Sequence, residues 1–360
     1  MTAPRTLGDI PTPALIVDVP ALDRNIARMA AFFAARPCKL RPHFKAHKTP
    51  EVARRQLAAG SCTGLTCATV LEAEAVASLC DDILIANEIV DPALCARVAA
   101  LARHGTATIA VDSAEGVSRI AGAAVNGGVT IGILVDVNVG QDRCGVEPGA
   151  EAVALGRRVA DSSGLRLRGV MGYEGHAVGI HDRPRREAET RRSMNQLAFT
   201  AHLFRDAGLP IEVVSTGGTG TFDIDCTFDS ITEVQAGSYA LMDTDYGKSG
   251  LPFEYASYVM GTVISRPVRH RCVADCGHKS CTKDHGNPDV RDIEGAAVTA
   301  LNDEHAVISL PPESRISIGD RVFLIPSHTD PTLNLHDVVY AVEGENIIDV
   351  WKVARGYPWL

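Results

Sequence analysis

The strongest constraint on this chain is a regular alternation of short apolar segments with longer amphipathic segments. Eight segments have the composition of buried strands, at residues 39–44, 64–67, 83–86, 107–111, 129–137, 167–173, 211–215 and 231–235. Helical patterns fill most of the gaps, for example at 70–79, 92–103, 114–125, 150–162 and 183–207. Strands that alternate with helices form a parallel sheet. Eight such units over about 200 residues predict a (β/α)8 barrel of the TIM type, and an open doubly wound sheet is the alternative.

The pattern changes after Tyr239. Short segments of alternating polarity follow, at 255–267, 269–274, 296–301, 305–310, 321–326, 337–342 and 347–353, separated by turns rich in Gly, Pro and Asp, and we expect no helices here. A strand predicted at 14–18 precedes the barrel pattern and can join this second part. The sequence therefore predicts an α/β protein, with a barrel domain at 20–245 and a mostly β domain from 1–19 plus 246–360.

Charge and composition narrow the range of partners. The formal net charge is −9 and no lysine- and arginine-rich run is present, which disfavours nucleic acids and anionic membranes. No apolar run is long enough to span a bilayer, and the first residues lack the apolar core of a signal peptide. The ten cysteines are scattered, so we expect reduced thiols in a cytoplasmic protein.

A lysine follows the first predicted strand, in the basic stretch at residues 39–48. Lys45 is the first lysine after the strand, and Lys48, His43 and His47 make its surroundings electropositive. A partly desolvated lysine in such a site has a lowered pKa and can form a Schiff base with a carbonyl. The same stretch, taken alone, fits a basic turn before a helix equally well.

Two later strand ends have the composition of phosphate-binding loops. The seventh strand runs into a Gly- and Thr-rich segment at 215–221, and the eighth runs into 235–239. Backbone N–H groups in such loops bind phosphate, and the loops after strands seven and eight are the usual phosphate site of a barrel. A single loop of this kind is usually only a turn. Two of them, together with a lysine after strand one, point to pyridoxal phosphate (PLP), which needs a lysine and a phosphate site.

At this point the chain resembles the fold-type III PLP enzymes of the alanine racemase-like family, and within it the branch of D-threonine aldolases and D-serine dehydratases. Matching motifs span nearly the whole chain, at 41–48, 142–145, 172–176, 215–219, 235–239, 275–279 and 326–335. The resemblance implies that Lys45 carries PLP, that Arg143 contacts its phenolic oxygen and that Tyr173 lies against its ring. Gln235 falls where alanine racemases place an arginine opposite the ring nitrogen, which implies a moderate electron sink. The implied cofactor-binding residues are Lys45, Arg143, Tyr173, Thr216, Gly217, Gly218, Gln235, Gly237, Ser238 and Tyr239.

A candidate metal site lies near the C-terminus. His328 and Asp330 alternate with Thr329, so on an extended segment both side chains point to one face and can hold a divalent metal. Two ligands alone fit a polar strand end equally well. The resemblance favours the metal, because dehydratases of this branch have His and Cys at these places and use zinc, whereas D-threonine aldolases have His and Asp. A carboxylate favours Mn²⁺ or Mg²⁺ over Zn²⁺, although Zn²⁺ remains possible.

A second set of possible ligands is less convincing. It comprises Cys272, Cys276, His278, Cys281 and His285, and its spacing matches none of the paired zinc-knuckle patterns. We therefore expect this region to be strand and turn.

The resemblance implies a lyase that is PLP- and metal-dependent and cleaves D-β-hydroxy-α-amino acids of the D-threonine type to glycine and an aldehyde. Lys45 would be catalytic, and His176, His181 or a metal-bound hydroxide would remove the β-hydroxyl proton. The nearest alternative is β-elimination by a D-serine or D-3-hydroxyaspartate dehydratase. An amino-acid racemase is a more distant alternative. A non-enzymatic alternative is a PLP-binding protein of the kind that has only the barrel. The resemblance further implies a homodimer with a small D-amino acid as substrate.

Overall fold

The computed structural model describes residues 5–357. Its contacts divide the chain into two units, which we call the barrel unit, Arg28–Lys45 with Ala53–Gly237, and the β unit, Met1–Ala27 with Ala46–Val52 and Ser238–Leu360. Residues 1–4 and 358–360, which the sequence assigns to the β domain, lie outside the described residues. α1 (Val19–Ala34) and α2 (Pro50–Ala58) contribute residues to both units.

Eight parallel strands form the barrel unit, in the order β2-β9-β8-β7-β6-β5-β4-β3. They are β2 (Lys39–Leu40), β3 (Leu65–Cys67), β4 (Asp82–Glu88), β5 (Thr106–Val111), β6 (Ile131–Asp136), β7 (Leu165–Met171), β8 (Val213–Thr216) and β9 (Glu233–Val234). Parallel bridges from Leu40 to Cys62 and from His43 to Thr66 join the two ends of this order. The sheet therefore closes on itself, which confirms the barrel and rules out the open doubly wound sheet.

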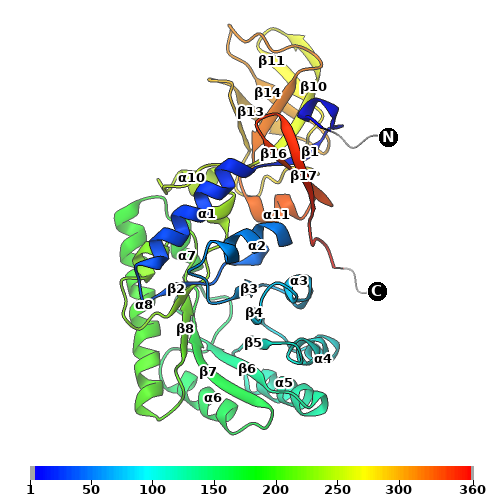
Figure 1. The fold of residues 1–360 in the computed structure, drawn as a ribbon. Helices are drawn as coiled ribbons and strands as arrows, with labels where there is room; N and C mark the ends of the chain where they lie inside the picture. The colour runs from blue at the N-terminus through cyan, green and yellow to red at the C-terminus, as the bar shows by residue number, and fades with distance from the viewer. Residues whose placement is uncertain (1–4, 358–360) are drawn as a thin grey trace. The chain divides into compact units, whose positions relative to one another are not determined.

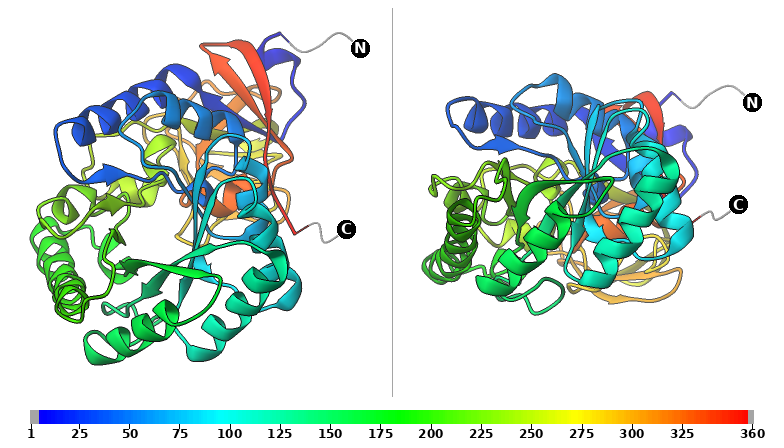
Figure 2. Two further views of the ribbon diagram at one scale, coloured as in Figure 1. Left: turned by 60° about the horizontal axis from the view of Figure 1, so that its bottom comes forward. Right: turned by 90° about the horizontal axis from the view of Figure 1, so that it is seen from below.

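Helices form a layer outside the strands of the barrel unit (Figures 1 and 2). They are α3 (Val70–Val76), α4 (Pro92–Leu101), α5 (Ala114–Gly127), α6 (Ala150–Ala160) and α8 (Arg183–Asp206), with the short α7 (Gly175–Val178) and α9 (Phe222–Asp225). Thr69, Asp91, Ser113 and Asp182 accept hydrogen bonds from amides in the first turns of α3, α4, α5 and α8. These side chains fix where each helix begins, because they satisfy amides that lack a partner within the helix.

The interior of the barrel is apolar at its centre. Leu84, Ala110, Leu134, Met171 and Val213, one from each of five successive strands, pack into one buried cluster. β6 is buried along its whole length, as expected for a strand covered on both faces.

The β unit is built on a mixed sheet with the main strand order β13-β14-β11-β10-β1-β16-β17. Its strands are β1 (Ala14–Asp18), β10 (Ser257–Val268), β11 (Arg271–Ala274), β12 (Asp289–Val290), β13 (Ala297–Leu301), β14 (Ala306–Ser309), β15 (Arg321–Ile325), β16 (Val338–Glu343) and β17 (Asn346–Lys352). β15 pairs with β10 and β12. β1 pairs with β10 and β16, so the N-terminal strand joins this sheet.

The structure corrects two expectations about local elements. β2 is shorter than the predicted strand at 39–44, and Lys45 lies in a 3₁₀ turn, η2 (Phe44–Ala46). Pro42 has no N–H to donate to a strand ladder, which explains the early end. The β unit also contains η3 (Ser238–Ala240), and two short helices, α10 (Thr244–Gly247) and α11 (Thr329–Leu333), lie after Tyr239, where none was expected.

Within residues 5–357, none of the helices has both the length and the apolar character needed to cross a membrane.

Candidate active site

The carboxyl ends of the barrel strands collect the residues that the sequence singled out. Lys45 follows β2, Tyr173 follows β7, Gly217 follows β8 and Gln235 follows β9. Parallel strands of a closed barrel all end at one rim, so these residues share that rim. Lys45 is half-buried there, inside η2.

Arg143 and Tyr173 lie close together at this rim. The Arg143 guanidinium is 5.7 Å from the centroid of the Tyr173 ring, and both line a pocket. Asn138 shapes the loop that carries Arg143, because its Oδ1 accepts from the amides of Gly140 and Asp142 at 3.1 and 3.2 Å. The other residues that line the pocket are Asp136, Val137, Asn138, Val139, Gln141 and Cys144.

An acidic group beside this pocket was missed by the sequence analysis. Glu88, Asp112 and Asp136 stand at or just after the ends of β4, β5 and β6. Burial raises the pKa of Asp136 well above its ordinary value, the charge and hydrogen bond of Glu88 raise it further, and Arg143 opposes the shift. A carboxylate after each of three apolar strands was the sequence signal that would have identified this group.

The loop after β8 packs tightly. The Oγ1 of Thr216 is 2.7 Å from the carbonyl oxygen of Gly172 and 3.0 Å from Oε2 of Glu174, so its side chain points into the protein. Gly217 has φ of +84°, and a Cβ there would lie 2.5 Å from a carboxylate oxygen of Asp225. The loop thus presents its backbone rather than side chains, as a phosphate site requires.

Two buried carboxyl groups lie beneath this loop. Glu174 and Asp225 are fully buried, and Thr221 donates a hydrogen bond to Glu174. Burial raises the pKa of both, and the charge of Glu174 raises that of Asp225 further. The sequence analysis missed this pair, whose members are far apart along the chain.

The other predicted cofactor residues divide between the two units. Gln235 is buried, and its Nε2 donates to Oγ of Ser215 at 2.9 Å. Gly237 ends the barrel unit, whereas Ser238 and Tyr239 begin η3 in the β unit. Tyr239 is buried and packs against Phe253, with ring centroids 5.6 Å apart.

The two candidate bases are exposed on the segment that follows β7. His176 lies in α7, and a Cβ on Gly140 would come within 3.1 Å of its ring, so the imidazole packs against the loop that carries Arg143. His181 precedes α8, and its carbonyl oxygen accepts from Arg186 at 3.2 Å.

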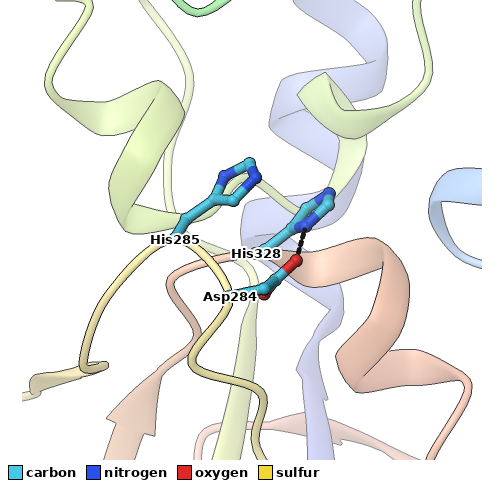
Figure 3. Close-up of side chains that lie close together, drawn as sticks. All are labelled: Asp284, His285 and His328. Carbon is cyan, nitrogen blue, oxygen red and sulfur yellow. Dashed lines mark hydrogen bonds and ion pairs between the residues drawn. The ribbon is translucent and has the colours of Figure 1, made fainter.

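The metal-type donors of the β unit form a different group from the predicted pair. His328 is the N-cap residue of α11 and Asp330 lies in its first turn, so the expectation of an extended segment is wrong. One donor atom each of Asp284, His285 and His328 lie within 4.8 Å of one another (Figure 3). Nδ1 of His328 is 2.6 Å from Oδ2 of Asp284. Asp330 is half-buried, and its Oδ1 is 3.5 Å from Oγ of Ser238.

Two carboxyl groups that interact with His328 have shifted pKa values. Burial alone would raise the pKa of Asp284, but hydrogen bonds from His328 and Thr282 lower it. Burial raises the pKa of Asp243 to about 6, with Asp330 adding to the shift and His328 opposing it.

The cysteines and histidines of the alternative zinc site do not come together as one set of ligands within residues 5–357. Cys272, Cys276 and Cys281 are free, buried thiols, and burial raises the pKa of each. His278 pairs with Asp303 at 2.8 Å. Among these cysteines and histidines, His285 is the only one that lies in a cluster of possible metal ligands within residues 5–357.

The histidine and aspartate side chains of the β unit suit a divalent metal, and the residues of the barrel rim suit PLP, as the sequence implied. Imidazole and carboxylate are the donors that bind divalent first-row metals such as Mn²⁺. A lysine, an arginine and a close-packed glycine loop at one barrel rim are the elements that hold PLP and its phosphate.

Comparison with known proteins identifies the family. Residues 17–245 match the model of the alanine racemase N-terminal domain, and residues 256–342 match the putative serine dehydratase domain. D-threonine aldolase of Arthrobacter sp. is 38% identical over 98% of this chain and 94% of that protein. D-threo-3-hydroxyaspartate dehydratase of Delftia sp. is 28% identical, covering 98% of this chain and 99% of that protein.

A solved structure agrees with these sequence matches. The crystal structure of D-threonine aldolase from Filomicrobium marinum superposes with a TM-score of 0.95 at 37% identity and covers 100% of both chains. The similarity therefore extends over both units, and the resemblance inferred from the motifs is confirmed. The chain belongs to the alanine racemase N-terminal domain family, in the lyase branch that carries a serine dehydratase-type second domain.

Proposed function

We propose that this protein is a PLP- and divalent-metal-dependent aldolase that cleaves D-β-hydroxy-α-amino acids of the D-threonine type to glycine and an aldehyde. The observation that carries this choice is Asp330, two residues after His328, where the dehydratases of the branch have cysteine. The full-length similarity to two D-threonine aldolases supports it.

The barrel rim supplies the residues that would hold PLP. The amine of Lys45 would bind the cofactor covalently, and Arg143 and Tyr173 would orient its ring from the pocket that they share. The backbone of Gly217 and Gly218 would receive the phosphate, because neither residue has a side chain to cover its N–H group. When bound, PLP supplies a sink for the electron pair of the Cα–Cβ bond, and the metal supplies positive charge at the β-oxygen.

His328 and Asp330 would hold the metal in the β unit. Their imidazole nitrogen and carboxylate oxygen favour Mn²⁺ or Mg²⁺, because the harder oxygen replaces the thiolate that favours Zn²⁺. Chelation with EDTA is expected to abolish turnover, and Mn²⁺ should restore it better than Zn²⁺.

Cleavage of the Cα–Cβ bond requires that the β-hydroxyl lose its proton. His176 and His181 are the candidate acceptors in the barrel unit, because both follow β7, whose end lies at the rim. Both side chains are exposed, so a proton taken up by either can pass directly to water.

Elimination is the second candidate, and the 28% identity to a D-threo-3-hydroxyaspartate dehydratase over nearly the whole chain favours it over a racemase. In that reaction Lys45 would take the Cα proton and the β-hydroxyl would leave. The products would then be a keto acid and ammonia instead of glycine and an aldehyde.

Product analysis tests the proposal directly. Purified protein with PLP and Mn²⁺ is offered D-threonine, D-serine and D-3-hydroxyaspartate, and the products are separated and identified. Glycine with acetaldehyde from D-threonine supports the aldolase. A keto acid and ammonia as the main products would contradict it, and L-allo-threonine formed from D-threonine without cleavage would indicate a racemase, because only the configuration at Cα would change.

Two further proposals concern the protein in the cell. A homodimer is supported by the family resemblance alone and is tested by light scattering of the purified protein. A cytoplasmic location is supported by the ten cysteines, which are scattered along the sequence as expected for reduced thiols. Fractionation of cells that produce the protein tests it.

A further inference from the structure

The loop between β11 and β12 brings a second histidine to the proposed metal site. His285 stacks on His328, with ring centroids 4.2 Å apart and an angle of 14° between the rings (Figure 3). The two residues are far apart in sequence, and the sequence analysis considered His285 only with the cysteine-containing set, not with His328. This contact therefore exists only in the folded β unit.

Each of the two rings is held by its own carboxylate through the same nitrogen. Nδ1 of His328 is 2.6 Å from Oδ2 of Asp284, and Nδ1 of His285 is 3.0 Å from Oδ2 of Asp245. A carboxylate can only accept, so Nδ1 of each ring faces its carboxylate as the donor, and Nε2 lies on the other side of the ring, away from that contact. A histidine that binds a metal through one nitrogen usually donates its other N–H to a carboxylate in this way.

The loop that carries these residues is tied to α11. The amide of Thr282 donates to Oγ1 of Thr332 at 3.2 Å, and Oγ1 of Thr282 lies 2.9 Å from Oδ1 of Asp284. Oγ1 of Thr332 in turn donates to the carbonyl oxygen of His328 at 2.9 Å. Asp284 is thus held on both carboxylate oxygens, and the loop cannot swing away without breaking several hydrogen bonds.

We propose that His285 is a further ligand of the metal, which binds through Nε2 of His285 and His328 while Asp245 and Asp284 hold the opposite nitrogens. Two nitrogens on one ion lie roughly 3–4 Å apart, given metal–nitrogen bonds of about 2.1 Å. One donor atom each of His285, His328 and Asp284 already lie within 4.8 Å of one another, and the two stacked rings would have to turn about their side-chain bonds to direct both Nε2 atoms at one ion. The inference rests on the proposed function, because it deepens the metal site assigned there to His328.

The test measures metal binding without any assay of activity. The chelated, PLP-loaded protein is titrated with Mn²⁺, and bound metal is followed by calorimetry and by loss of the free Mn²⁺ signal in electron paramagnetic resonance. His285→Ala is expected to weaken Mn²⁺ binding at least roughly tenfold, and Asp245→Asn and Asp284→Asn to weaken it about 10–100-fold. His278→Ala is the matched control, since His278 also pairs with a carboxylate, Asp303, at 2.8 Å. It should bind Mn²⁺ like the parent protein.

A second variant separates a ligand from a packing role. His285→Cys should shift the ratio of Zn²⁺ to Mn²⁺ affinity towards Zn²⁺, because a thiolate prefers the softer ion. If the His285 ring only stacked on His328 without binding the metal, its loss would leave the ratio of Zn²⁺ to Mn²⁺ affinity unchanged. Parent-like Mn²⁺ affinity in His285→Ala, or an unchanged ratio in His285→Cys, would overturn the inference.

His328→Ala distinguishes this inference from the proposed function. If His328→Ala loses Mn²⁺ and His285→Ala keeps it, the assignment of His285 fails and the metal-dependent aldolase stands. If His328→Ala also binds Mn²⁺ like the parent, the metal site itself is wrong, and the proposed function fails with it.

Discussion

Replacement of Arg41 by methionine should destabilise the barrel unit strongly. Nε of Arg41 is 2.8 Å from Oε1 of Glu233, and Nη1 is 3.2 Å from Oδ1 of Asp82. The side chains of Arg41 and Glu233 are only 2% and 4% exposed. Burial alone would lower the pKa of Arg41, but the charges of Glu233 and Asp82 raise it, so the guanidinium stays charged.

The expected loss follows from the group that the substitution leaves behind. Methionine retains the apolar stem of Arg41, so little packing is lost, but the Glu233 carboxylate stays buried without its countercharge. Breaking a buried pair in this way costs about 3–5 kcal/mol. Arg166→Met is the control on β7, because Arg166 also forms an ion pair, with Glu212 at 2.7 Å, but the two side chains are 64% and 46% exposed. An exposed pair contributes at most about 1 kcal/mol.

Urea unfolding followed by far-ultraviolet circular dichroism measures both variants. The free energy of unfolding should fall by several kcal/mol for Arg41→Met and by little for Arg166→Met. Adding Glu233→Gln to Arg41→Met should recover part of the loss, because it removes the buried unpaired charge. If Arg41→Met cost no more than Arg166→Met, or if the double variant were less stable than Arg41→Met, the reasoning would be refuted.

Three further predictions concern the barrel rim. Borohydride reduction of the PLP-loaded protein followed by peptide mapping should place the label on Lys45, and a label on Lys48 would contradict that assignment. Gly217→Ala should lower PLP affinity at least roughly tenfold, because its Cβ would lie 2.5 Å from a carboxylate oxygen of Asp225. Gly208→Ala is the control, since Gly208 also has a positive φ but open space around it, and it should leave PLP affinity unchanged. Equal PLP affinities of the two variants in an absorbance titration would contradict this. Burial raises the pKa of Asp225 well above its unfolded value near 4, so its contribution to stability is present below about pH 4 and is lost as the pH rises through the folded pKa. Asp225→Asn should therefore be more stable relative to the parent protein at pH 8 than at pH 5, and urea midpoints that shift equally at both pH values would contradict this.

Local patterns in the sequence determined most of the architecture. Apolar periodicity identified eight strands with helical crossovers, because it reports which face of each element is buried. The carboxyl-end rule then placed Lys45, Tyr173 and Gly217 at one rim, since parallel strands of a closed barrel leave no other arrangement. The family resemblance was also readable from the motifs, and the comparisons confirm it.

Polar pairs between distant segments were decided only by the tertiary structure. α11 is five residues long, and its start is held from elsewhere in the chain, because the amide of Thr329 donates to Asp243 at 3.1 Å. A helix of this length has too few hydrogen bonds to show as a periodic pattern, so the segment resembled an extended one. His285 stacks on His328, and Glu174 lies beneath the same loop as Asp225, only because the fold closes long stretches of chain between them. Periodicity in the sequence indicates which residues are buried, but it does not indicate which polar side chains contact one another. The candidate site depends on those contacts between distant segments.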